Sequence, residues 1–179
     1  MGLVYIASVT ASASATVSFT TGIDATYNEY QFHFANMHPA TDNVDFQFQV
    51  NAAGQSGFNE VMTTTAFSSF HNESDSSSGI GYEVNLDQAQ GTAYQPILIF
   101  AAGNDADQST SGVLRLFNPS STTYVKHFTS EGNGAHYVEY SVSLFSAGYI
   151  NTTNAIDEIS FKFASGNIDA GTIHMYGVG

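Results

Sequence analysis

Cysteine is absent from the 179 residues of this chain. A disulfide framework, a thiolate nucleophile and a cysteine-ligated zinc site are therefore all excluded. The chain also has no segment close to the roughly 18 consecutive apolar residues that a membrane-spanning helix needs. The fold must therefore be held by a hydrophobic core without covalent cross-links.

Positive charge is nearly absent as well. Arg115, Lys126 and Lys162 are the only arginine and lysine residues, against 16 aspartates and glutamates, and the net charge is −13. Nucleic-acid binding needs a patch of cations that displaces the counterions of the phosphates, and three cations cannot form one. Attraction to an anionic membrane surface needs the same kind of patch. We therefore expect neither nucleic acid nor a membrane as a partner.

Charged residues of either sign are scarce, at 11% of the chain, which is less than half the usual share. Serine, threonine, asparagine and glutamine must therefore supply most of the polar surface. Apolar residues, at 42%, and aromatic residues, at 13%, are too frequent for a disordered chain. This composition is typical of β-sheets with neutral outer faces, or of surfaces that are buried in an assembly.

Hydrophobic residues recur with a period of two. In the stretch EYQFHFAN, Tyr30, Phe32 and Phe34 share one face and the polar residues between them take the other, as in a strand that is buried on one side. Similar alternation, or runs of β-branched and aromatic residues, predicts further strands. These cover residues 3–8, 16–20, 43–51, 94–102, 112–118, 123–130, 136–147, 157–165 and 172–178.

About ten short strands without a helical period predict one all-β domain over residues 1–179. Residues 61–71 favour strand or loop over helix, and residues 69–91 predict a long surface loop that contains short strands. No internal repeat or break in composition marks a domain boundary. We expect an antiparallel β-sandwich, jelly-roll-like in its topology, in which the first and last strands pair.

The last predicted strand lies in SGNIDAGTIHMYGVG. Its glycines are predicted to flank a turn that returns the chain antiparallel to residues 157–165. Ile173 and Met175 would then continue the apolar layer of the core. His174 and Tyr176 would point to the opposite face, where we expect a contact with another subunit or another protein.

One acidic loop has the spacing of a cation site. Asp105, Asp107 and Ser109 stand where an EF-hand places calcium ligands. However, Thr110 replaces the glycine of that loop and Leu116 replaces its final glutamate. The segment therefore favours an acidic loop between two strands, with a weakly bound cation at Asp105 and Asp107 as the alternative.

No combination of residues predicts catalysis. Asp157 and Glu158 are neighbours on a predicted strand, so their side chains point to opposite faces and cannot act as the carboxylate pair of a glycosidase. The patterns of the nucleophile elbow, the P-loop and the zinc-protease helix do not occur. The six histidines are scattered along the chain. We expect no enzyme activity, no catalytic residue, no metal centre and no cofactor.

Five stretches, in order along most of the chain, are distinctive as a set. They are MHPATDN (37–43), DQAQGTAYQ (87–95), LFNPSSTTYVKHF (116–128), AGYINTT (147–153) and SGNIDAGTIHMYGV (165–178). Together they resemble a family of small virion surface proteins from marine bacteriophages. The resemblance implies a phage structural protein with a jelly-roll-like fold, and it brings no active-site residue with it.

Within this resemblance we expect a capsid decoration or cement protein that binds the assembled shell and stabilises it. Its partners would be the major capsid protein or other virion proteins, its place the capsid surface rather than the tail, and its oligomeric state a homotrimer. His174 and Tyr176 are then candidate contacts with a second subunit or with the capsid. A tail fibre would call for an attachment region and a long repetitive shaft, which the sequence does not display.

The alternative is a receptor-binding or carbohydrate-binding module on the tail, with host-surface polysaccharide as its partner. Exposed aromatic side chains on sandwich loops stack against sugar rings, and Tyr82, Tyr94, Tyr137 and Tyr149 are the candidates. The chain has ten tyrosines but no tryptophan. Packing between neighbouring strands is the simpler role for a tyrosine in a β-protein.

Overall fold

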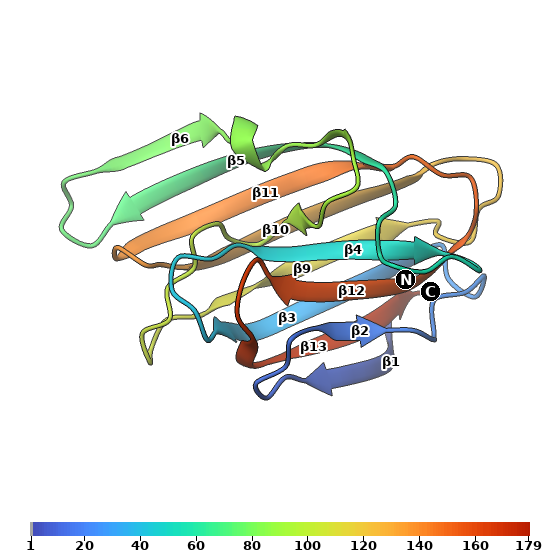
Figure 1. The fold of residues 1–179 in the computed structure, drawn as a ribbon, viewed down its shortest axis with the longest axis horizontal. Coiled ribbons are helices and arrows are strands. Elements are labelled where there is room, and N and C mark those ends of the chain that lie inside the picture. Colours follow the sequence, from blue (N-terminus) through green and yellow to red (C-terminus); the bar gives the residue numbers. More distant parts are fainter. Residues whose placement is uncertain (1) are drawn as a thin grey trace.

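Two antiparallel β-sheets packed face to face form the molecule in the computed structural model, which describes residues 2–179 (Figure 1). In this part of the chain, the larger sheet has nine strands and the smaller has four. In spatial order, the large sheet contains β1 (Leu3–Thr10), β13 (Ile168–Val178), β3 (Glu29–Pro39), β9 (Thr110–Phe117), β10 (Lys126–His136), β11 (Tyr140–Ile150), β5 (Met62–Asn72) and β6 (Ser78–Tyr82), with the short β7 (Ala89–Gly91) also on β5. The small sheet contains β2 (Val17–Phe19), β12 (Ile156–Phe163), β4 (Phe46–Ala52) and β8 (Gln95–Pro96).

Eight of these strands follow the strand order of a jelly roll. Four of them, β1, β13, β3 and β9, are neighbours in the large sheet, and β2, β12, β4 and β8 are neighbours in the small sheet. The chain passes from one sheet to the other between most successive members of this set, which makes its first and last strands neighbours. The predicted all-β sandwich and the pairing of its first and last strands are therefore confirmed.

Two insertions into the jelly roll extend the large sheet on one side. Residues 62–91 form β5, β6, a 3-10 helix (Val84–Leu86) and β7, and residues 126–150 form the hairpin β10–β11. Strand β11 pairs with β5 along its whole length, so that the two insertions form one continuous extension of the large sheet. We call β10, β11, β5 and β6 the wing, and Figure 1 shows it reaching past the edge of the small sheet.

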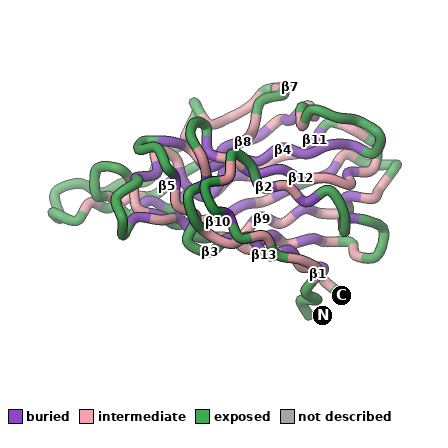
Figure 2. The backbone as a smooth tube through the Cα atoms, turned by 60° about the horizontal axis from the view of Figure 1, so that its bottom comes forward, coloured by how far each residue is buried: buried purple, intermediate pink, exposed green. Residues whose placement is uncertain are grey.

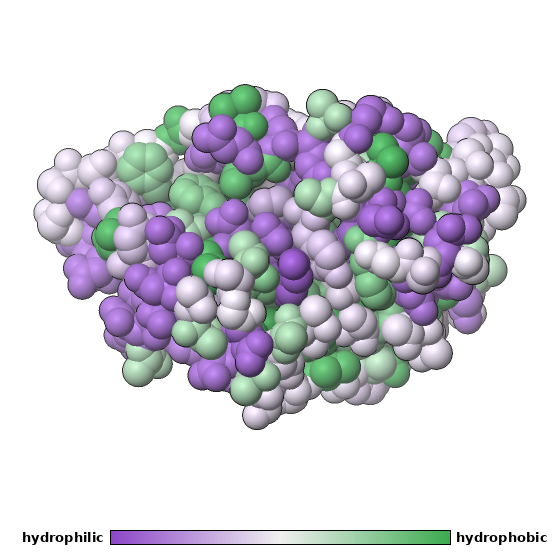
Figure 3. All heavy atoms as spheres, viewed as in Figure 1, coloured by the Kyte–Doolittle hydropathy of each residue, from purple (hydrophilic) through white to green (hydrophobic). Residues whose placement is uncertain are grey.

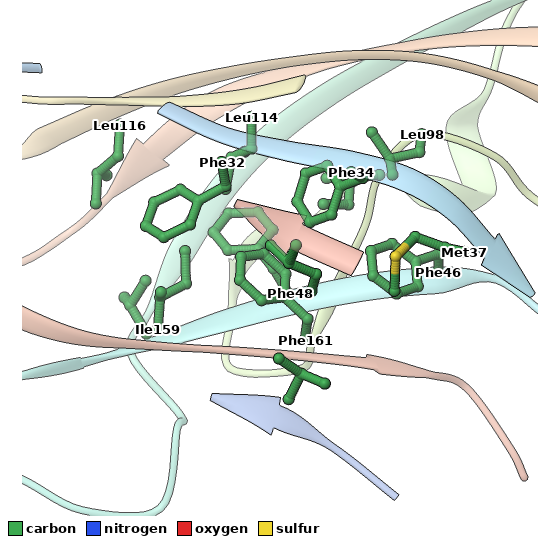
Figure 4. Close-up of a cluster of buried hydrophobic side chains, with 14 of the residues drawn as sticks. Phe32, Phe34, Met37, Phe46, Phe48, Leu98, Leu114, Leu116, Ile159 and Phe161 are labelled. Carbon is green, nitrogen blue, oxygen red and sulfur yellow. The ribbon is translucent and has the colours of Figure 1, made fainter. Parts of the chain in front are cut away.

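An aromatic layer fills the space between the two sheets. Phe32, Phe34, Phe46 and Phe161 lie in this layer (Figure 4), and the ring of Phe34 meets those of Phe46 and Phe161 edge to face at 5.5 and 5.1 Å. Burial of such a side chain contributes about 1.5–3 kcal/mol. The alternation predicted for β3 is confirmed, because its odd-numbered neighbours Gln31 and His33 are only partly buried on the outer face of the sheet.

Strand β13 lies inside the large sheet, between β1 and β3. Ile173 and Met175 are fully buried, as predicted. The predicted pairing of this strand with residues 157–165 is wrong, because that segment forms β12 of the small sheet. The turn between β12 and β13 crosses from one sheet to the other, and β13 begins at Ile168, inside the segment that the sequence assigned to the turn.

The predicted strand over residues 94–102 is correct only for Gln95–Pro96, which form β8. Regular strand pairing ends after β8, because Leu98 and Ala101 take left-handed backbone angles, with φ of 66° and 52°, and Ala102 forms only isolated bridges with Val44 and His136. Ile97, Leu98 and Ile99 are nonetheless fully buried. We call residues 93–102 the covering segment, since it lies over the inner face of the wing where the small sheet ends. The predicted ends of the neighbouring hairpin shift as well: β10 continues to His136 and β11 starts at Tyr140.

Two fully buried glutamines hold the covering segment in place. The Gln95 side-chain amide donates to the carbonyls of Leu86 and Pro96, at 2.9 and 3.0 Å, and its oxygen accepts a hydrogen bond from Thr64 Oγ1 at 2.8 Å. The Gln49 amide donates to the carbonyls of Thr92 and Ala93, at 3.2 and 3.1 Å. These bonds supply the partners that the two buried side-chain amides require, and they tie the amides to the backbone at the start of the covering segment.

Glycine makes room for the covering segment on the wing. A side chain at Gly132 would place its Cβ 2.5 Å from the Cα of Leu98, and one at Gly112 would lie 2.7 Å from Leu98 Cδ2. Figure 2 shows the contrast between this buried middle of the molecule and the exposed loops and turns at the end of the wing.

We expect Gly132→Ala to lower the free energy of unfolding by about 1–3 kcal/mol, the usual cost of overpacking a core. The matched control is Gly81→Ala on β6, where a Cβ meets nothing within 4 Å, and which should change stability by less than about 0.5 kcal/mol. Urea unfolding of both variants measures the difference. Equal stability of the two variants would contradict a fixed contact between Gly132 and Leu98.

Candidate functional site

The outer face of the wing carries two shallow depressions lined by aromatic and hydroxyl side chains. One, of about 480 Å³, lies across β5, β11, β10 and β9. A second, of about 400 Å³, lies beside it across β5, β11 and β10. Figure 3 views the molecule from the opposite side, where the small sheet lies and hydrophilic residues are spread over much of the surface.

A pair of phenylalanines forms the apolar part of the first depression. Phe67 and Phe145 are directly opposite each other in the β5–β11 register. Their rings stack with centroids 5.0 Å apart and planes 28° from parallel. Phe67 is 45% exposed, which is high for a phenylalanine in the middle of a strand. The pair therefore offers an apolar surface to something outside the chain.

Polar groups complete the first depression. The Asn133 side-chain amide donates to Ser141 Oγ and Ser143 Oγ, at 3.0 and 3.1 Å. Beside it, the Arg115 guanidinium donates to Glu131 at 3.1 Å, so the two charges neutralise one another. The result is a neutral surface with a stacked aromatic pair and several hydroxyl and amide groups. It suits a flat, uncharged ligand with hydroxyls, or a neutral protein surface.

The second depression has a similar character. Thr63, Thr65 and Thr129 line it together with His127 and Tyr149. The rings of His127 and Tyr149, which are paired across β10 and β11, meet at 6.3 Å between centroids. Tyr149 thus belongs to this outer face, as one of the four tyrosines proposed from the sequence for sugar stacking.

The other three tyrosines lie in separate places. Tyr82 is on β6 opposite Phe67, on the same outer face, and its hydroxyl donates to Asp87. Tyr94 lies under the ammonium of Lys162, 4.7 Å from its ring centre. Tyr137 lies in the turn between β10 and β11. The structure therefore brings two of the four, Tyr82 and Tyr149, to the outer face of the wing.

His174 and Tyr176 lie on the outer face of β13, opposite to the core, as the sequence predicted. Tyr176 contacts His33 of β3, with ring centroids 4.9 Å apart, and Tyr5 of β1, at 5.9 Å. Burial lowers the pKa of His33, and the charges of Arg115 and His174 lower it further. This aromatic cluster extends from the β1 edge to β3, where His33 is paired with Val113 of the first depression.

Asp105 and Asp107 are exposed on the loop before β9. The Asp105 carbonyl accepts a hydrogen bond from the backbone amide of Gln108 at 2.8 Å, which closes a tight turn. Within residues 2–179, no three histidine, aspartate or glutamate side chains lie close enough together to hold a metal ion. A weakly bound cation at these two aspartates stays a prediction.

Within residues 2–179, no helix is long and apolar enough to cross a membrane.

Phe67 and Phe145 were not predicted from the sequence as site residues. On β5 the inward positions hold small or polar residues, such as Ala66 and Ser68, while Phe67 points outward. The covering segment packs on this side of the wing, where Thr64 Oγ1 of β5 donates to Gln95 at 2.8 Å and Ser146 Oγ of β11 donates to the Pro96 carbonyl at 3.1 Å. The sequence does contain a sign of this site, because Phe67 occupies a position of β5 that alternation assigns to the exposed face.

Comparisons with known proteins give little further guidance. No protein-family model and no curated protein sequence matches the chain. A structural-genomics protein of unknown function from Bacteroides ovatus is similar in part, with a TM-score of 0.32 and 9% sequence identity. The likeness covers 60% of this chain, and the chain spans 46% of that protein. A likeness of this extent supports no statement about function.

Lys126, at the start of β10, is a buried cation beneath the second depression. Its side chain is fully buried, and Nζ donates to the Thr152 carbonyl at 3.1 Å. Burial lowers the pKa of the ammonium, and the charge of Glu60 opposes part of this shift. The unfolded chain therefore binds the proton more tightly than the folded protein does, so the buried charge costs stability below the folded pKa.

We expect Lys126→Met to raise the melting temperature near neutral pH, because the buried charge is removed. The gain should shrink as the pH rises through the lowered pKa toward 10.5, the ordinary lysine value, since the wild-type lysine then becomes neutral in the folded state. Thermal unfolding at pH about 7 and about 10 measures this, with Lys162→Met as the control. A gain that is the same at both pH values would contradict the buried charge.

Proposed function

We propose that this chain is a non-catalytic virion surface protein, most specifically a capsid decoration or cement protein that binds an assembled shell and stabilises it. The observation that carries the binding part is the neutrality of the wing's outer face. Across residues 63–69, 127–133 and 141–149 the single Asp, Glu, Lys or Arg is Glu131, and it is paired with Arg115. A broad neutral face on a chain of net charge −13 suits contact with another protein.

The phage part of the proposal is supported by the resemblance of five sequence stretches to virion surface proteins. It assigns the major capsid protein, or another virion protein, as the partner and the capsid surface as the location. In this proposal the protein acts as a homo-oligomer. Its stabilising effect follows from mass action, because a ligand that binds only the assembled shell shifts the equilibrium toward that state.

Purified protein added to capsids stripped of their surface proteins should sediment with the shells and raise the temperature at which they disassemble. Phe67→Ser should weaken this binding by roughly thirtyfold, the effect of losing about 2 kcal/mol from a central aromatic contact. The control is Tyr124→Ser, since Tyr124 is 70% exposed and lies outside the wing. If the wild-type protein fails to bind the shells, the capsid proposal is wrong.

A second candidate function is binding of host-surface polysaccharide on the tail. The specific observation in its favour is the first depression, where the Phe67–Phe145 pair lies beside Asn133, Ser141 and Ser143. Aromatic rings can stack on the apolar face of a sugar while amide and hydroxyl groups bind its hydroxyls, which is the usual design of a small-ligand site.

Titration calorimetry with polysaccharide from the host surface tests this second function. Asn133→Ala should weaken binding by about fivefold to tenfold, as expected for the loss of one or two hydrogen bonds. Asn104→Ala, on the exposed loop before β9, is the control. Absence of heat at all concentrations removes the polysaccharide function, and release of short sugar chains would instead indicate an enzyme.

A further inference from the structure

One side of the sandwich is an edge without charge. Strand β1 ends the large sheet and β2 ends the small sheet on the same side. Both come from the first 23 residues, which contain no Asp, Glu, Lys, Arg or His. In a chain of net charge −13, two copies can meet at this edge without bringing like charges together.

Strand β1 has the features of an edge made for pairing. It runs for eight residues without proline or glycine, with one register irregularity between Tyr5 and Ala7. Among residues 2–179, its outward row of backbone N–H and C=O groups has no neighbour in the sheet. Leu3, Val4 and Tyr5 leave much of their side chains exposed, with Tyr5 at 57%. Natural proteins protect such edges unless another strand covers them.

The edges on the other side are protected. Strand β6 is five residues long and contains two glycines, and Glu73, Asp75 and Glu83 flank it. Strand β8 of the small sheet has two residues, one of which is Pro96. Short length, nearby charge and proline each discourage pairing with another chain. The contrast places the unprotected edge at β1.

We propose that β1 pairs antiparallel with β1 of a second copy of this chain. A second copy fits better than an unrelated partner, because a neutral strand offers no charge that a cationic or anionic partner could recognise. Antiparallel pairing of a strand with itself is isologous, so one patch serves both copies. Two large sheets then join into one continuous sheet. The inference concerns the free protein and does not depend on capsid or polysaccharide binding.

A two-fold contact departs from the homotrimer expected from the sequence. A closed ring of three needs a heterologous contact, in which β1 of one copy meets a different surface of the next. The edges available for strand addition on the far side are β6 and β8, and both are protected. The self-paired β1 edge therefore favours two copies over three.

Light scattering on the purified full chain tests the proposal, and it should give twice the 19.1 kDa mass of one chain. Val4→Glu should shift the mass to that of the monomer, because it places a charge from each copy at an otherwise uncharged contact. Ile80→Glu is the matched control on β6, where Ile80 is 76% exposed, and it should leave the dimer intact. Circular dichroism verifies that both variants keep the β-fold.

The absence of cysteine allows an independent test that does not perturb the edge by charge. Under mild oxidation, Tyr5→Cys and Ala7→Cys should include at least one variant that forms a covalent dimer, whereas Ile80→Cys should remain mostly monomeric. A wild-type mass of one or three chains overturns the β1 pairing. So does cross-linking at position 80 that equals or exceeds that on β1.

Discussion

The large sheet is wider than the small sheet. The inner face of the wing is therefore not covered by a full strand of the small sheet. Because the small sheet ends at the two-residue β8, residues 93–102 must bury their apolar side chains on the wing while leaving the hydrogen-bonding pattern of a sheet. The glycines of β9 and β10 provide the space, and Gln49 and Gln95 satisfy the backbone carbonyls. The inward neighbours of Phe67 on β5, Ala66 and Ser68, are small, and Phe67 itself lies on the outside.

This arrangement separates the aromatic core of the jelly roll from the outer face of the wing. The jelly roll contains the aromatic layer around Phe161 and supplies much of the hydrophobic burial. The wing consists of two insertions that pair with each other, and its outer side chains are released from any role in the core. Functional residues are commonly found on additions that a rigid scaffold positions. The neutral outer face of the wing fits that pattern.

The sequence predicted those strands whose two faces differ clearly. Alternation identified β3 because Tyr30 and Phe32 face the core while Gln31 faces outward. The prediction of a strand failed at Leu98, because an apolar run resembles a buried strand. The backbone of Leu98 leaves the strand conformation, and the residue packs against glycines of distant strands. Alternation also failed to give the partner of β13, because hydrophobic alternation is the same in either sheet. The Phe67–Phe145 pair could not be predicted, because the sequence does not show which face of the wing the covering segment buries.

The position of β13 has a consequence for the order in which the fold can form. Its partner β1 lies at the start of the sequence, and Leu3 pairs with Val178. The large sheet therefore stays divided between β1 and β3 until residue 178 has left the ribosome. Contacts between such distant segments require closure of a long loop, which slows folding. During synthesis one edge of β3 stays unpaired until β13 is made, and incomplete chains present this additional strand edge, which favours aggregation.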